Sequence, residues 1–337
     1  MKTFSRLAAV STLAVSAVSG VAMAAPIAFP PPANGLVTLQ YGDFSVYSLG
    51  LLNYYSTGNP GVPSGNDPYH LPTGPSRLGD YIVVATGAPG ASNVAHANTD
   101  NPFNTAQPGS PSSFWTGSAP EPTPTFTGDN NGTWDVSVDA LRGYLRGQSL
   151  FFGFNLNEAD EGSSLSGDPQ DALAWGQVTL VDLDSGLDPV SFVFDGTNPV
   201  PFIEQQTLFD AGDGVAWGHI HGQICVRDIT AGAPQFLHVG ACTPADVGGR
   251  TIRQNLGTDS AAFALTNEEL NSLVQSSGYD ILRFDFRLSD LNNGYEQLFI
   301  FGAGPGSGTP VPEPAAIGLL GLGILGIAAA RRRKQAA

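Results

Sequence analysis

Strict alternation of apolar and polar residues is the pattern that most narrows the folds open to this chain. It is clearest over 280–288, where every second residue is a large apolar one: Leu282, Phe284, Phe286 and Leu288. Successive side chains of a β-strand point to opposite faces, so the segment predicts a strand with one buried face. Within 149–157, Phe151 breaks a similar alternation. Alternation or short apolar runs predict further strands over 36–41, 44–49, 81–85, 133–138, 149–157, 173–183, 190–194, 220–226, 261–265 and 296–302.

Helix signals are few. Thr266 and Glu269 form a capping box ahead of a helix expected over 267–276, and Asp139 is expected to cap a helix over 140–146. The 42 Gly and 26 Pro residues favour turns over long helices. We therefore expect an all-β fold, a sandwich or jelly roll with two short helices. An open Greek-key barrel is the alternative.

The body of the chain is expected to be one domain over 36–302, with a split near residue 130 as the alternative. Residues 86–130 lack alternation and are rich in Gly, Pro, Ser, Thr and Asn. A stretch of this length without regular structure is usually a functional loop or a flexible segment. Residues 303–310 are expected to be a flexible linker.

The N-terminus has the composition of an export signal. Lys2 and Arg6 precede an apolar stretch over 7–21, and small residues follow it. This pattern predicts a secretory signal peptide over 1–24, cleaved before Ala25. A retained N-terminal membrane anchor is the alternative.

The C-terminal tail has three parts in order: Pro312-Glu313-Pro314, the uncharged run 315–330, and the cluster Arg331-Arg332-Arg333-Lys334. As a helix the uncharged run would be about 24 Å long, somewhat short for a bilayer core of about 30 Å. The basic cluster should stay in the cytoplasm, which places the body on the far side of the inner membrane.

This tail resembles the PEP-CTERM sorting signal of Gram-negative bacteria, which an exosortase reads. The resemblance implies that the sorting residues are Pro312, Glu313, Pro314, Arg331, Arg332 and Arg333. It also implies a transient inner-membrane helix over 315–330, removal of the tail, and delivery to the cell surface or the extracellular exopolysaccharide (biofilm) matrix. An ordinary C-terminal membrane anchor is the alternative.

The charge of the body excludes some partners. Residues 25–310 hold eight bases, all Arg, against 29 acids, a formal charge of −21. A nucleic-acid binder needs a basic surface, so we expect no nucleic-acid partner. An acidic body favours solubility and bridging to acidic polymers through divalent cations.

Cys225 and Cys242 are the two cysteines of the chain. Export places them in an oxidising compartment, so we expect one structural disulfide. It would close an 18-residue loop and contribute up to about 3 kcal/mol to stability.

Two groups of residues are candidate metal ligands. Asp182, Asp184 and Asp188 alternate beside a Gly and offer the oxygen ligands that Ca²⁺ prefers, although the EF-hand pattern is not matched. A solvated turn is the alternative. His219 and His221 are expected on one face of a strand, about 6.5–7 Å apart. A third ligand could come from His238, an Asp or a reduced Cys225; an ordinary polar face, shared with Gln223, is the alternative.

The search for catalytic motifs is mostly negative. The chain has no nucleophile elbow, P-loop or zincin motif. A polysaccharide hydrolase needs only two facing carboxylates, for which Glu158 and Glu161 are candidates, although solvated acids are the simpler interpretation. Trp115, inside the 86–130 segment, either pins that segment to the core or offers a flat face to a ligand.

Together these features predict an exported, non-catalytic protein of the cell surface or exopolysaccharide matrix, sorted by an exosortase. We expect no cofactor, with calcium the one ion considered. An exported polysaccharide hydrolase or a carbohydrate-binding module is the alternative.

Overall fold

The structure is a computed structural model in which residues 26–308 form one compact unit. The described residues are 27–30, 38–65, 67–74, 77, 80–87, 98–105, 112–118, 126–158, 170–184, 186–197, 203–206, 216–228, 234–276, 278–291 and 296–304. The expected signal peptide and sorting helix lie outside these ranges. Within them, no helix is both long and apolar enough to cross a bilayer.

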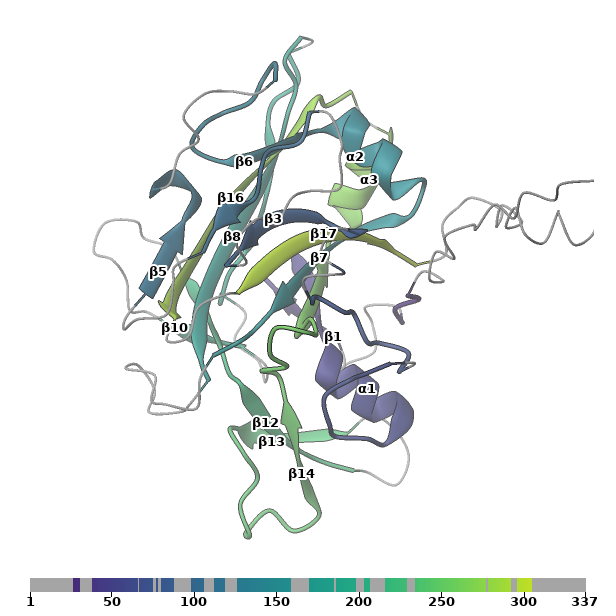
Figure 1. Ribbon diagram of the computed structural model, residues 1–337, viewed down its shortest axis with the longest axis vertical. Coiled ribbons are helices and arrows are strands. Elements are labelled where there is room, and N and C mark those ends of the chain that lie inside the picture. Colours follow the sequence, from purple (N-terminus) through teal and green to yellow (C-terminus); the bar gives the residue numbers. More distant parts are fainter. Residues whose placement is uncertain are drawn as a thin grey trace, which may run out of the picture. The chain divides into compact units, whose positions relative to one another are not determined.

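Two seven-stranded sheets dominate the fold (Figure 1). The first sheet has the order β1 (Thr38–Tyr41), β2 (Phe44–Ser48), β15 (Phe263–Thr266), β7 (Ser149–Asn155), β17 (Gln297–Ala303), β3 (Ile82–Thr86) and β4 (Phe103–Asn104). The second has the order β10 (Ile203–Gln206), β11 (Trp217–Ile220), β8 (Ala172–Val181), β16 (Ile281–Leu291) and β5 (Ser112–Trp115). Two more strands extend it, β6 (Trp134–Ser137) on β16 and β9 (Val190–Phe194) on β8. Every pairing is antiparallel except β3 with β4.

The two sheets pack face to face and enclose the main core. Phe152 of β7 lies 5.1 Å from Phe284 of β16 between ring centroids, and Phe154 lies 6.2 Å from Phe286. All four rings are buried. The alternation over 280–288 is confirmed, because β16 buries every second residue and leaves those between them half-buried. The expected all-β, sandwich-like architecture is therefore confirmed.

The first sheet is buried on its outer face as well, which explains why Phe151 breaks the alternation of β7. Its ring stacks on Phe29 at 4.7 Å between centroids and lies 5.6 Å from Phe301. The domain therefore includes 27–30, ahead of the expected start at residue 36. The carbonyl of Ile27 also accepts a hydrogen bond of 2.8 Å from the amide of Gly304.

A third, smaller sheet has the order β13 (Gln235–Val239), β12 (Gln223–Arg227) and β14 (Gly249–Arg253). Helix α1 (Leu49–Thr57) lies beside it (Figure 1). At Gly50 the helix approaches the backbone of Arg253 so closely that a Cβ would collide with its carbonyl oxygen. The strand expected over 220–226 is two strands, because the chain turns between β11 and β12.

Both expected helices exist, but each cap is one or two residues from its expected place. In α2 (Val138–Leu145) the cap is Ser137, whose hydroxyl accepts from the amide of Ala140. Ahead of α3 (Glu268–Ser276), Asn267 accepts from the amide of Leu270 at 2.7 Å. The expected cap, Thr266, instead donates its hydroxyl to a carbonyl of β7.

The expected count of two helices is wrong, because α1 is a third. Its first six residues, Leu49 to Tyr54, are all buried, and its last turn, which includes Tyr55, is exposed. Its apolar residues therefore do not follow one face of a helix, which is the pattern that predicts a helix from sequence. The 86–130 segment also contains regular structure: β4, β5 and a 3₁₀ turn over Thr116–Ser118. The linker expected from residue 303 begins later, since Ala303 ends β17.

Candidate metal centre and neighbouring sites

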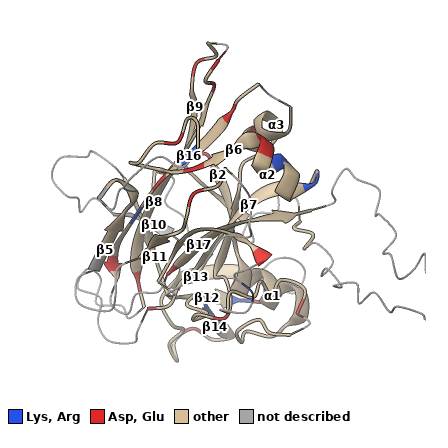
Figure 2. Ribbon diagram, turned by 45° about the horizontal axis from the view of Figure 1, so that its top comes forward, with Lys and Arg blue, Asp and Glu red and all other residues tan. Residues whose placement is uncertain are grey.

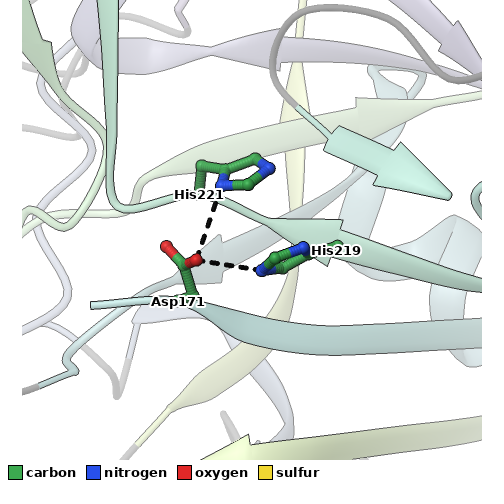
Figure 3. Close-up of side chains that lie close together, drawn as sticks. All are labelled: Asp171, His219 and His221. Atoms are coloured by element: carbon green, nitrogen blue, oxygen red, sulfur yellow. Dashed lines mark hydrogen bonds and ion pairs between the residues drawn. The ribbon is translucent and has the colours of Figure 1, made fainter. Parts of the chain in front are cut away.

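Antiparallel pairing of β8 and β11 brings together one acidic and two imidazole side chains. Ile220, the last residue of β11, pairs with Ala172, the first residue of β8. Asp171 therefore lies just outside β8, directly beside His219 and His221 at the end of β11 (Figure 3).

Both imidazoles approach the same oxygen of Asp171. Oδ2 lies 2.9 Å from Nε2 of His219 and 3.5 Å from Nδ1 of His221. The two ring centroids are 4.2 Å apart, and one ligand atom from each of the three residues falls within 4.8 Å of the others. The exposed fractions are 1% for Asp171 and 3% for each histidine. The cluster is thus built in the interior.

A glycine turn fixes the carboxylate from its other side. The amide of Gly222 donates to Oδ1 of Asp171 at 3.2 Å. Its carbonyl in turn accepts from the amides of Gln254 and Asn255 at 2.8 and 3.0 Å. A Cβ at position 222 would lie 2.7 Å from the carbonyl oxygen of Gln170, so this turn requires glycine.

Sequence reasoning found two of these three residues. His219 and His221 do lie side by side, as expected, but their ring centroids are 4.2 Å apart rather than 6.5–7 Å. His221 lies just beyond β11, which ends at Ile220. Of the third ligands considered, His238 instead pairs with Asp246 at 3.0 Å. The third member is Asp171, which no motif marks. The sequence places Asp171 just before a predicted strand. It does not predict that this strand pairs with β11, which is what brings Asp171 to the histidines.

The disulfide between Cys225 and Cys242 is present, as predicted, with a Cα–Cα distance of 4.9 Å. It ties β12 to the segment that follows β13. Because Cys225 is oxidised, it is not a thiolate ligand in this structure.

The Asp182 turn uses its carboxylate locally. Oδ1 accepts from the amide of Asp184 at 2.9 Å, and Oδ2 accepts from the amide of Leu187 at 3.2 Å. Asp184 and Asp188 are exposed. The three acids are not brought together as the cluster at Asp171 is, and calcium binding here stays a prediction.

Glu158 lies buried against a second carboxyl that the sequence did not single out. Burial and the neighbouring carboxyl of Glu158 raise the pKa of Glu296 well above its usual range. Glu161, the other carboxyl considered for hydrolysis, lies outside the described residues. Catalysis by Glu158 and Glu161 therefore stays a prediction.

Trp115 is both anchored and exposed. Its indole nitrogen donates to Asp285 at 3.1 Å, and the guanidinium carbon of Arg287 lies 4.4 Å from its ring centroid. The same guanidinium carbon lies 4.8 Å from the ring centroid of Trp175. Trp115 nevertheless remains 40% exposed. The indole is thus held in place with part of its surface open to solvent.

Two family models match the chain. The model for a domain of unknown function, DUF8239, matches residues 27–287, and the model for the PEP-CTERM protein-sorting motif matches residues 310–334. No curated protein and no solved structure gives a significant match. The second match contains the whole set of sorting residues expected from the sequence.

Proposed function

We propose a function from the premise that the chain belongs to the DUF8239 family and ends in a PEP-CTERM protein-sorting motif. That motif marks an exported, surface-sorted protein of Gram-negative bacteria that an exosortase processes. Beyond this, the mature domain is a non-catalytic component of the cell surface or the exopolysaccharide matrix. The sorting motif is the observation that carries the proposal.

The charge of the domain supports a role among acidic polymers. Figure 2 shows acidic residues recurring along loops and strand ends of the described chain, with few basic residues among them. Between residues 25 and 310, acids exceed bases by 21. Such a surface repels an acidic polysaccharide directly, but divalent cations can bridge the two. Association with the matrix should therefore depend on divalent cations.

The test follows the protein through sorting. Intact mass spectrometry of the cell-surface fraction should find a chain that ends near Pro314, since the tail is removed. Deletion of 311–337 should leave export intact but release the protein into the medium. If the cell-surface protein still ends at Ala337, the tail is not removed, and it acts as an ordinary membrane anchor instead.

Matrix association is tested separately. The mature protein should sediment with exopolysaccharide in the presence of Ca²⁺ and be released by a chelator. Equal sedimentation with and without chelator would contradict cation bridging, while leaving the sorting result unaffected.

A carbohydrate-binding module is a second candidate, favoured by the exposure and fixed orientation of Trp115. Sugars stack on flat aromatic faces, and an indole already held by Asp285 and Arg287 loses little entropy on binding. Trp115→Ala should abolish glycan binding by the mature protein. Tyr55→Ala is the matched control, because Tyr55 is 49% exposed on α1. Equal loss in both variants, or no loss in either, would contradict this role.

A further inference from the structure

We propose that Asp171, His219 and His221 bind one divalent transition-metal ion of the class that prefers imidazole and carboxylate ligands, with Zn²⁺ as the defining example. The site goes beyond the proposed surface role and does not depend on it. Zinc sites with three protein ligands use this mixture of nitrogen and oxygen donors.

The donor atoms are close to the spacing that such an ion needs. With metal–ligand distances of about 2.0–2.1 Å and tetrahedral angles, two donor atoms lie about 3.3 Å apart. The distance from Oδ2 of Asp171 to His221 Nδ1 is 3.5 Å, and that to His219 Nε2 is 2.9 Å. The donor atoms of the two imidazoles lie within 4.8 Å of each other, so binding requires the two rings to rotate toward a common point.

Convergence of both rings on one oxygen is the feature that favours a metal over a simple ion pair. One imidazole is enough to pair with this oxygen, and His219 is already within hydrogen-bonding distance of it. The second ring nevertheless approaches the same oxygen, with Nδ1 of His221 at 3.5 Å and the two ring centroids 4.2 Å apart. A single divalent ion accounts for this convergence, because it binds both imidazoles and compensates the charge of the carboxylate.

The surroundings hold the ligands in place. Metal-binding carboxylates are usually oriented by a hydrogen bond on the oxygen that faces away from the metal. Oδ1 of Asp171 has that bond from the amide of Gly222. The Gly222 carbonyl is held by Gln254 and Asn255, so the turn is itself fixed. A bound ion would cross-link the start of β8 to the end of β11.

The experiment uses the protein isolated from the cell surface without a polyhistidine tag, stripped with a chelator and then titrated with Zn²⁺. Inductively coupled plasma mass spectrometry after dialysis should find one Zn²⁺ per chain. His219→Gln and Asp171→Asn should each lose the ion. His238→Gln is the control, because His238 also pairs with an aspartate, Asp246, although that pair is more exposed and has no second imidazole among the described residues. It should retain the ion.

Substitution with Co²⁺ gives a readout that needs no variant. Coordination by imidazole and carboxylate in a low-coordinate site should give strong visible absorption in the wild-type protein. Wild-type protein that retains no Zn²⁺, or whose Co²⁺ spectrum is that of the hydrated ion, would overturn the proposal. So would full retention of Zn²⁺ by folded Asp171→Asn and His219→Gln proteins. If those variants do not fold, the wild-type Co²⁺ spectrum decides.

Discussion

Replacing Gly153 with Ala tests the packing of the first sheet at its most crowded point. Gly153 lies in the middle of β7, directly opposite Phe299 of β17. A Cβ added there would lie no more than 3.0 Å from three atoms of the Phe299 ring. The ring has no room to retreat, because it is fully buried and stacks on Tyr81 at 4.6 Å between centroids.

Two opposing terms set the size of the effect. Forcing one methyl group into a packed core costs about 1–3 kcal/mol. Replacing a glycine inside a strand recovers about 0.5–1 kcal/mol of backbone entropy. The free energy of unfolding of Gly153→Ala should therefore fall, by up to about 2.5 kcal/mol.

Gly143→Ala is the matched control, with the opposite sign. Gly143 lies exposed in α2, and its added Cβ would meet nothing within 4 Å. The same substitution should therefore raise the free energy of unfolding by about 0.5–1 kcal/mol. Urea unfolding of both variants, at an unchanged slope, measures the difference. A Gly153→Ala protein as stable as Gly143→Ala would refute the argument that the Phe299 ring is fixed against β7.

Three further predictions concern the disulfide, the buried carboxyl pair and the Asp182 turn. Reducing the Cys225–Cys242 disulfide should lower the free energy of unfolding by up to about 3 kcal/mol. Urea unfolding with and without reductant measures this, and an unchanged free energy of unfolding would contradict a structural role. Glu296 has a raised folded-state pKa, so its contribution to stability is complete below its ordinary pKa of 4.5 and is lost as pH rises through the folded value. The melting temperature of Glu296→Gln, relative to that of wild type, should therefore increase as pH rises. Glu268→Gln removes an exposed carboxyl and is the control, so its melting temperature should change with pH as that of wild type does. Millimolar Ca²⁺ should raise the melting temperature of wild type but not of Asp184→Ala, and an equal rise in both would remove the Asp182 turn as a calcium site.

Alternation predicts a strand most clearly where its burial is one-sided. It marks β16 because one face of that strand lies in the core and the other is partly exposed. It does not mark β13, which has no fully buried residue. Strands buried on both faces, such as β3 and β15, are predicted from short apolar runs instead. An apolar run is ambiguous between strand and helix, which is why α1, whose first six residues are all buried, is not predicted.

The candidate site was only partly predictable for a related reason. His219 and His221 are two residues apart, so alternation along a strand predicts that their side chains share a face. Asp171 is 48 residues away from His219 and reaches it through strand pairing. Glu296 reaches Glu158 in the same long-range way. Contacts of this kind depend on which strands pair in the sheet, and the local pattern of one sequence does not predict that pairing.

The hydrogen bond between Gly304 and Ile27 has a consequence for how the protein meets the membrane during export. It places the entry and the exit of the domain at neighbouring points. The expected signal peptide would precede one point, and the sorting motif follows the other. A chain held first by one segment and then by the other would thus be held through the same edge of the domain.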